Sequence, residues 1–465
     1  MLEVFTPRHG DIRSRSVDHD AVLRDLSEPG CPVCRAGEAA DRNWHSWYVI
    51  ETHSDPDYRH RVARAGGFCA AHLRWLCLDT RAQPHLTQAF ADVIDLVLAQ
   101  PSDAPEPTAP CPACVSRRDA QTQRMRKILE LWADSTVRQA LASSDCCVPH
   151  QLALLHDAPA AAADEVAQMT IRTLTEPSAG LLSVLIPLDA DLARSAPMIV
   201  HANRIRRSDD KEVTGRSGLD RAVADLDRGC CPVCRSASQA QLRYLCWLLE
   251  QSLRELDTTE LWLCPRHLGM ATVFGYASAQ QLADTMSGHT LARLRRLHDR
   301  LAETIRNGQL HTRIAHSVHS LRAGSGVAEV VRPLGSRVAE CRGHFEHDAT
   351  PCAVCTAAAI AERREIALLR ASADEPAVRR QWEQGHGPCL SHARQCDDDR
   401  ALLVLRSRLR LLAWELDETL RKRGWTARNE PVTVVEQAWR RAVPLLNGAA
   451  YFGMTSDEWE QAVPS

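Results

Sequence analysis

The sequence predicts an all-α protein, and three observations support this fold class. Helix-forming residues such as Ala, Leu, Arg and Glu are frequent, whereas the 465 residues include only 5 Tyr and 6 Phe. Apolar residues recur at three- and four-residue steps over long stretches, as in Gln123–Trp132 and Ala240–Arg254. The same short motifs also recur along the chain, which indicates a fold built from helical repeats.

The repeated motifs are four CxxC sequences, each followed by a CxxH sequence. The third cysteine comes 35, 33, 30 and 34 residues after the second, and the pentapeptide CPVCR occurs twice with identical letters. The four successive sets are Cys31, Cys34, Cys69 and His72; Cys111, Cys114, Cys147 and His150; Cys231, Cys234, Cys264 and His267; and Cys352, Cys355, Cys389 and His392.

Three cysteines and one histidine are the ligands of a tetrahedral zinc site. A CxxC turn presents two thiolates, and a CxxH in the first turn of a helix presents its two ligands at i and i+3 on one face. We therefore predict that each CxxC binds Zn²⁺ together with the CxxH that follows it, giving four ions per chain. Because four protein ligands leave no open position, the sites are predicted to be structural. We expect zinc at these sites in preference to an iron–sulfur centre.

Other interpretations of the cysteines are weaker. A CPxC redox dithiol needs a thioredoxin-like βαβ setting, and the surroundings here are helical. The letters His344-Phe-Glu346 before Cys352 and Cys355 match a zinc deaminase signature, but too few residues separate the two halves. Six cysteines remain; Cys146 and Cys230 directly precede predicted ligands and stay open as alternative ligands. The others are Cys77, Cys246, Cys341 and Cys396.

Each predicted unit is a CxxC turn, a helix, a CxxH and a longer amphipathic helix. The amphipathic stretches are Leu86–Leu98, Ala163–Leu174, Leu291–Ile305 and Ala401–Arg421. We expect four zinc-pinned helical-hairpin repeats, arranged as two pairs, with short extended inserts. The expected boundaries are an N-terminal segment 1–30, zinc units 31–100, 111–176, 221–320 and 352–425, inserts 177–220 and 321–351, and a helical tail 426–465 with a helix beginning near Pro431.

Most tryptophans are predicted to pack in the core around these hairpins, in preference to forming an aromatic ligand-binding stripe. They are Trp44, Trp47, Trp75, Trp132, Trp247, Trp262, Trp382 and Trp414.

Charge and hydropathy limit the partners and the compartment. The formal net charge is −3, so a nucleic acid or an anionic membrane is not the default partner. The longest apolar run, Leu181–Leu188, is too short to span a bilayer, and the first residues lack the apolar core of a signal peptide. We therefore expect a cytoplasmic protein whose partner is another protein, and the oligomeric state stays open.

The motif pattern resembles an uncharacterised family of bacterial proteins with repeated CPxC…GFCxxH metal-binding helical modules. The resemblance is carried by CPVC at 31–34 and by Gly67-Phe-Cys-Ala-Ala-His72, with weaker echoes in the other three units. The fourth unit replaces the CPxC proline with Ala353. The resemblance implies a helical, metal-pinned fold and no assigned activity.

No phosphate-binding loop, dinucleotide fingerprint, HExxH or nucleophile elbow occurs, which argues against an enzyme. The favoured hypothesis is a zinc-binding helical scaffold that binds another protein. A zinc-dependent nucleic-acid-binding regulator and a thiol/zinc redox sensor stay open as alternatives.

Overall fold

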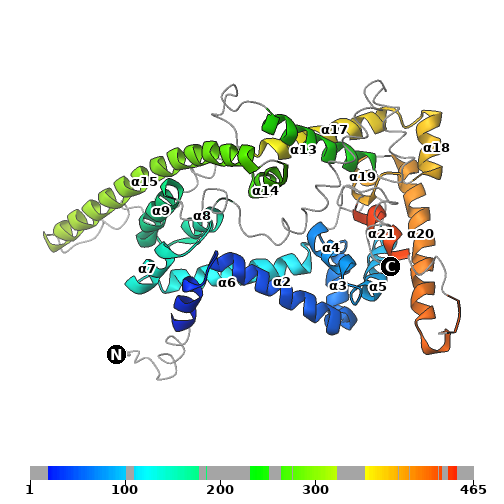
Figure 1. The fold of residues 1–465 in the computed structure, drawn as a ribbon, viewed down its shortest axis with the longest axis horizontal. Coiled ribbons are helices and arrows are strands. Elements are labelled where there is room, and N and C mark those ends of the chain that lie inside the picture. Colours follow the sequence, from blue (N-terminus) through cyan, green and yellow to red (C-terminus); the bar gives the residue numbers. More distant parts are fainter. Residues whose placement is uncertain are drawn as a thin grey trace. The chain divides into compact units, whose positions relative to one another are not determined.

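The computed structural model describes a chain whose ordered elements are helices (Figure 1). The described residues are 19–100, 109–176, 185, 231–250, 263–274, 276–321, 351–385, 387–396, 398–427, 429–431 and 438–447. Within these ranges no residue is in a β-strand, so the predicted all-α class is confirmed there. In the same ranges, no helix combines the length and the apolar character needed to cross a membrane.

Each CxxC motif begins a long helix. The four helices have the same length, 19 residues, and each starts at the residue after the first cysteine: α2 (Pro32–Ile50), α6 (Pro112–Glu130), α13 (Pro232–Glu250) and α17 (Ala353–Ala371). In three of them proline occupies the first helical position, where its missing N–H is not needed and its fixed φ suits the helix. The second cysteine therefore lies in the first helical turn.

A short helix follows three of these long helices, and each has 9 residues: α3 (Pro56–Arg64), α7 (Ser135–Ser143) and α18 (Pro376–Gln384). Asp55 caps α3 by accepting hydrogen bonds from the backbone N–H groups of Asp57 and Tyr58, and Asp134 caps α7 through that of Thr136. A one-turn 3₁₀ helix, η1 (Thr52–Ser54), precedes α3.

Each CxxH motif begins another helix. These helices are α4 (Ala70–Leu78), α8 (Val148–Asp157), α14 (Pro265–Phe274) and α19 (Leu390–Gln395). The cysteine of the motif is the N-cap residue of α4, α8 and α19, so the histidine lies in the first turn. A longer helix then follows each one: α5 (Gln83–Ala99), α9 (Ala160–Thr175), α15 (Tyr276–Leu321) and α20 (Asp399–Lys422).

The CxxC-led helices pack in pairs, and the first pair is antiparallel. Asp41 of α2 forms an ion pair with Arg117 of α6, and Gly37 of α2 lies against the Gln121 side chain of α6. As the residue number rises on one helix it falls on the other, so α2 and α6 run in opposite directions (Figure 1). Helices α13 and α17 also pack against each other. A CxxC motif therefore lies at each end of the α2–α6 pair.

The chain forms two compact units, and each unit combines three separated segments. The first contains Met1–Glu38, Asp119–Asp189 and Gln251–Cys352; the second contains Ala39–Arg118, Ala190–Glu250 and Ala353–Ser465.

The main core of the second unit lies between α5 and α20. Leu86, Phe90 and Ile94 of α5 and Leu405, Leu409 and Leu416 of α20 are almost fully buried in one cluster. Arg406 donates hydrogen bonds to the carbonyl oxygens of Leu98 and Gln100 at the C-terminal end of α5, 2.8 and 3.1 Å away. Arg423, after the end of α20, contacts Pro84 and Thr87 at the other end of α5, so the two helices are antiparallel. Helix α21 (Ala438–Asn447) packs on both.

The first unit has its own core, where α9 packs against α8 and α15. Small residues such as Ala163 and Ala167 on α9 and the buried Leu294 and Leu301 on α15 suit a close helix contact. His298 of α15 lies 3.2 Å from a carboxylate oxygen of Asp164 of α9, which fixes the register of the two helices.

The predicted amphipathic stretches all fall within helices α5, α9, α15 and α20. The inserts predicted at 177–220 and 321–351 lie outside the described residues except for 185, 321 and 351, and so does the segment from 432 to 437 in which the tail helix was expected to begin. The prediction that tryptophans fill the core is wrong for Trp47, Trp247 and Trp414, which are exposed, whereas Trp44, Trp132 and Trp382 are buried.

The α5–α20 core gives a direct stability test. Leu409→Ala should lower the free energy of unfolding of the second unit by about 2–5 kcal/mol, because it empties a fully buried position. Leu403→Ala on the same helix should change it by less than about 0.5 kcal/mol, because Leu403 is exposed. Urea denaturation followed by circular dichroism measures both; equal effects would contradict the packing described.

Candidate metal sites

The sixteen cysteines and histidines singled out by the motifs come together in four groups of four. The ligand atoms of each group lie within 4.8 Å of one another. The groups are site 1 (Cys31, Cys34, Cys147, His150), site 2 (Cys69, His72, Cys111, Cys114), site 3 (Cys231, Cys234, Cys389, His392) and site 4 (Cys264, His267, Cys352, Cys355).

The predicted pairing of the motifs is wrong, because no CxxC shares a group with the CxxH that follows it. The CxxC of site 1 precedes α2, and its CxxH begins α8, more than a hundred residues later. Site 2 lies between them in the sequence and joins the first CxxH to the second CxxC. Sites 3 and 4 repeat this nested order. No stretch such as 31–100 or 111–176 therefore contains a complete site.

The length of the CxxC-led helix contributes to this grouping of each CxxC with a CxxH other than the next one. A 19-residue helix such as α2 spans about 28 Å, whereas the nine residues of α3 return only about 13 Å. The CxxH at the start of α4 lies beside the second half of α2, where the His72 and Trp44 rings form an edge-to-face contact with their centroids 5.2 Å apart. The antiparallel α6 begins at that end and supplies its own CxxC there.

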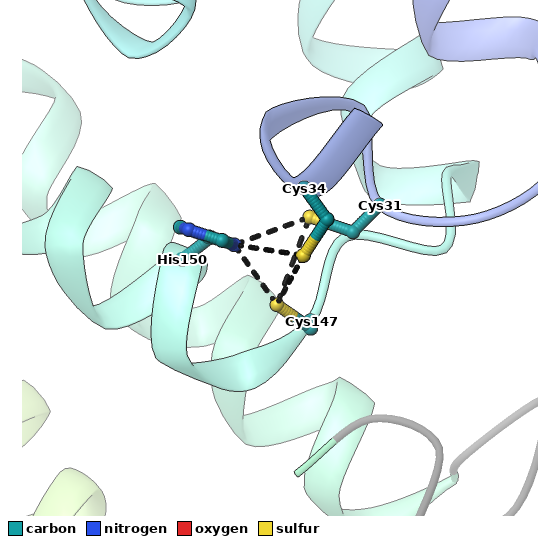
Figure 2. A group of neighbouring side chains, drawn as sticks. All are labelled: Cys31, Cys34, Cys147 and His150. Carbon is teal, nitrogen blue, oxygen red and sulfur yellow. Dashed lines mark hydrogen bonds between the residues drawn. The ribbon is translucent and has the colours of Figure 1, made fainter. Parts of the chain in front are cut away.

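Site 1 illustrates the geometry of the ligands (Figure 2). The His150 Nδ1 atom lies 3.4 Å from the sulfurs of Cys31 and Cys34 and 3.1 Å from that of Cys147. The Cys147 sulfur is 3.6 Å from that of Cys31 and 3.8 Å from that of Cys34. All three cysteines are buried.

These distances fit one tetrahedral ion in the centre of each group. An ion with metal–sulfur bonds of about 2.3 Å and a metal–nitrogen bond of about 2.0–2.1 Å separates its sulfurs by about 3.8 Å and sulfur from nitrogen by about 3.6 Å. The corresponding Sγ–Sγ distances are 3.4 Å between Cys114 and Cys69 in site 2 and 3.8 Å between Cys234 and Cys389 in site 3. Thiolate and imidazole donors in a tetrahedron suit zinc or another thiophilic metal rather than Mg²⁺ or Ca²⁺.

The same imidazole nitrogen faces the sulfurs in all four sites. His72 Nδ1 lies 3.0 Å from Cys69 Sγ, His392 Nδ1 lies 3.2 Å from Cys389 Sγ, and His267 Nδ1 lies 3.3 Å from Cys264 Sγ. The first turn of the CxxH helix imposes this orientation, because it places the cysteine and the histidine one turn apart. Nδ1 is therefore the candidate ligand atom, and Nε2 points away from the ion.

The thiols of each group influence one another strongly. In site 2, hydrogen bonds with Cys114 and Cys69 hold the pKa of Cys111 well below its usual value, whereas hydrogen bonds with Cys111 and Cys69 raise the pKa of Cys114. Without a cation the group therefore favours one thiolate over several, because like charges repel at these distances. A divalent ion would remove this repulsion, and its binding would release protons.

Site 1 has a fifth thiol beside it. The Cys146 sulfur is buried 4.0 Å from the Cys31 sulfur, and its hydrogen bond is the largest cause of the lowered pKa of Cys31. Cys147, and not Cys146, lies near His150 in the group, as the motif spacing predicted. The other alternative ligand, Cys230, lies outside the described residues.

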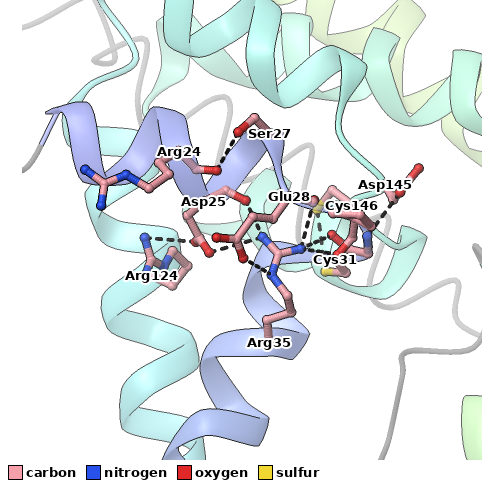
Figure 3. Close-up of polar contacts among 11 residues, drawn as sticks. Arg24, Asp25, Ser27, Glu28, Cys31, Arg35, Arg124, Asp145 and Cys146 are labelled. Carbon is pink, nitrogen blue, oxygen red and sulfur yellow. Dashed lines mark hydrogen bonds and ion pairs between the residues drawn. The ribbon is translucent and has the colours of Figure 1, made fainter.

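The last residue of CPVCR holds the first metal-binding turn in place (Figure 3). Arg35 forms an ion pair with Asp25 at 3.1 Å and donates hydrogen bonds to the backbone carbonyl oxygens of Asp25, Glu28, Pro29 and Gly30. Arg124 of α6 pairs with the other carboxylate oxygen of Asp25 at 3.0 Å. Arg35 thus holds the backbone of residues 25–30, which immediately precede Cys31.

Two residues at the sites were missed by the sequence analysis. Asp41, which is 1% exposed, lies 3.1 Å from the Nε2 atom of His72, and Glu362 lies 3.3 Å from that of His392. Burial alone lowers the pKa of His72, but the hydrogen bonds with Asp41, Cys111 and Cys69 outweigh it and raise the pKa to about 12. A usable signal existed: each acid comes ten residues after the first cysteine of a CxxC.

The rival interpretations of the motifs gain no support. Cys352 and Cys355, which matched part of a deaminase signature, lie with Cys264 and His267 in site 4, and the two other signature residues lie outside the described ranges. Every CxxC has a CxxH beside it, and no described strand provides a thioredoxin-like setting.

Comparison with known proteins identifies no relative. No family model matches the chain, no curated protein matches it, and no solved structure matches it. The family resemblance is therefore supported only in its coarse features, namely four Cys₃His groups and helices as the secondary structure of the described residues.

The exchanged pairing predicts the metal content of double variants. If the four sites each hold one ion, the double variant Cys34→Ser/His150→Ala should contain one ion fewer than the wild type, because both residues belong to site 1. Cys34→Ser combined with His72→Ala should lose two, because it damages sites 1 and 2. Elemental analysis of the purified proteins measures the difference. A loss of two ions from the first double variant and of one ion from the second would instead support the pairing of each CxxC with the next CxxH.

Proposed function

We propose that the chain is a zinc-binding helical scaffold protein in which four structural Zn²⁺ ions hold the helices together. The observation that carries this proposal is the set of sulfur–sulfur and sulfur–nitrogen distances in sites 1–3, which suit a tetrahedral ion with three thiolates and one imidazole. Four protein ligands complete the coordination, so the ions serve the fold and not a reaction at an open position.

The same proposal includes the internal organisation of the chain. Four related helical units form two pairs, and within each pair the two units exchange their CxxH motifs. The shared 19-residue length of the CxxC-led helices and the shared 9-residue length of α3, α7 and α18 support it. Two duplicated units whose half-sites face each other across an antiparallel helix pair would produce this nested order.

The scaffold would bind another protein through α20. Leu403, Leu411 and Trp414 are each 59–62% exposed. At about 100° per residue they lie within about 80° of the helix circumference, opposite the leucines that pack on α5. An exposed tryptophan beside two exposed leucines on a rigid helix is typical of the anchor of a protein–protein interface.

Removal of the metal tests the structural role of the ions. Prolonged treatment with a strong chelator should abolish most of the helical circular dichroism signal, because structural zinc contributes about 10–16 kcal/mol per site and domain stabilities are about 5–15 kcal/mol. Addition of Zn²⁺ should restore the signal, and addition of Mg²⁺, as the control, should not. A metal-free protein with unchanged helicity and unfolding midpoint would contradict the proposal.

Substitutions on α20 test the interaction surface. The tagged zinc-loaded protein and its Leu411→Ser/Trp414→Ser variant should retain the same metal content, but the variant should recover a specific protein partner from source cells about tenfold less well. Leu78→Ser, which changes an exposed leucine on α4, serves as the matched control. If quantitative mass spectrometry finds identical partners for all three proteins, α20 is not the binding surface.

A further inference from the structure

Helix α20 presents to solvent a stripe of residues with the spacing of a coiled coil. Its members follow one another in alternating steps of three and four positions, and all of them are exposed. They are Arg400, Leu403, Ser407, Arg410, Trp414 and Asp417. This spacing keeps the side chains on one face of the helix, in the pattern that packs against a second helix. The leucines that pack on α5 lie on the opposite face of α20.

The stripe is complementary to its own reverse. Arg400 comes three positions before Leu403, and Asp417 comes three positions after Trp414. In one antiparallel register of two α20 helices, Leu403 of each copy therefore meets Trp414 of the other. In the same register Arg400 of each copy meets Asp417 of the other. Such a two-fold contact repeats every interaction, so one register provides two apolar layers and two opposite-charge pairs.

The apolar residues of this contact form a continuous surface. Leu411, which is exposed at the edge of the stripe, would lie beside the half-buried Val404 of the second copy. At the centre, Ser407 of one copy faces Arg410 of the other. The small serine leaves room for the aliphatic part of the arginine, and the guanidinium can reach water. The contact therefore buries the exposed apolar side chains of α20 without burying a charge at its centre.

The charges of the stripe favour the antiparallel orientation over the parallel one. A parallel pair would place Arg400, Arg410 and Asp417 each opposite its own copy, where like charges repel. The end of the stripe near Asp417 is also rich in negative charge, because burial and the neighbouring Asp417 and Asp92 raise the pKa of Asp95 on α5. Arg400 of a second copy would therefore meet more than one carboxylate there.

The acids beside Arg400 have other positions or partners. Asp398 is the N-cap of α20 and accepts hydrogen bonds from the backbone N–H groups of Arg400 and Ala401. Asp399 lies about 100° further round the helix than Arg400. Arg400 also pairs with the exposed Asp374 at 3.0 Å, and an ion pair in water is exchanged at little cost. The guanidinium of Arg400 is thus the charge that the stripe presents at this end.

We propose that two copies of the chain associate through an antiparallel contact between their α20 helices. Leu403 of each copy packs on Trp414 of the other, and Arg400 of each pairs with Asp417 of the other. The contact is two-fold and uses the same surface on both copies, so it closes at a dimer. The inference rests on the proposed function, because it names the partner of the α20 surface described there.

Sedimentation equilibrium of the zinc-loaded full-length protein tests the dimer over a series of concentrations. The wild type should dimerise, and Trp414→Ala should raise the dissociation constant about 30-fold or more, because it removes the aromatic anchor from both halves of the contact. Leu78→Ser, which changes an exposed leucine on α4, is the control and should dimerise like the wild type. Metal content and circular dichroism should be the same for all three proteins.

Charge exchange tests the orientation and the register. Arg400→Asp and Asp417→Arg should each raise the dissociation constant about tenfold, because like charges then meet at both ends of the contact. The double variant Arg400→Asp/Asp417→Arg should dimerise like the wild type, and so should an equimolar mixture of the two single variants. An acid near the N-terminus of α20 and a base near its C-terminus suit the helix dipole, so these variants should keep the helix.

A wild type that stays monomeric throughout the series would overturn the inference. A dimer that Trp414→Ala does not weaken would lie elsewhere on the chain, and a double charge variant that fails to restore dimerisation would exclude this register. If the monomeric protein still recovers a different protein through Leu411 and Trp414, the proposed function stands without the dimer. Protein that binds no zinc would instead overturn the proposed function itself.

Discussion

The reach of a 19-residue helix is the constraint on which the arrangement of the metal sites depends. A helix of this length carries the chain about 28 Å from its CxxC, and the nine-residue α3 that follows covers only about 13 Å. The CxxH at the start of α4 lies beside α2, where His72 contacts Asp41, and the antiparallel neighbour α6 supplies its CxxC there. In α2 and α6 the contacts of Gly37 with Gln121 and of Asp41 with Arg117 follow from this opposition.

The Cys₃His groups and the apolar cores hold different parts of the helices. Each group fixes where two helices begin, because its cysteines and histidine all lie in N-cap or first-turn positions. The helices that come after the CxxH motifs, α5, α9, α15 and α20, then bury their apolar faces against each other in the pairs α5–α20 and α9–α15. Cys31, Val33 and Cys34 at the start of α2 are buried as well.

The sequence was sufficient for the helices and for the ligand positions, because both depend on local patterns. Apolar periodicity located α5 and α20, and the CxxC and CxxH spacings selected Cys147 over its neighbour Cys146. The pairing of half-sites could not be found in the same way, since it depends on where α2 ends and not on the separation of Cys34 from Cys69. The sequence also did not predict that Trp414 is exposed. Helix α20 has apolar residues on two faces, and their periodicity does not show which face packs against the rest of the protein.

The exchange of half-sites has a consequence for how the chain reaches its native state. During synthesis Cys34 emerges long before His150, and for that interval the nearest CxxH is the wrong one, Cys69 and His72. Chain entropy slightly favours this error, because closing the native loop of 113 residues costs about 1 kcal/mol more than closing the incorrect loop of 35 residues. In the folded chain Cys34 lies in the first turn of the 19-residue α2, and Cys34 and His72 belong to different groups. Helix α2, and not the length of the loop, thus separates the half-sites that are neighbours in the sequence.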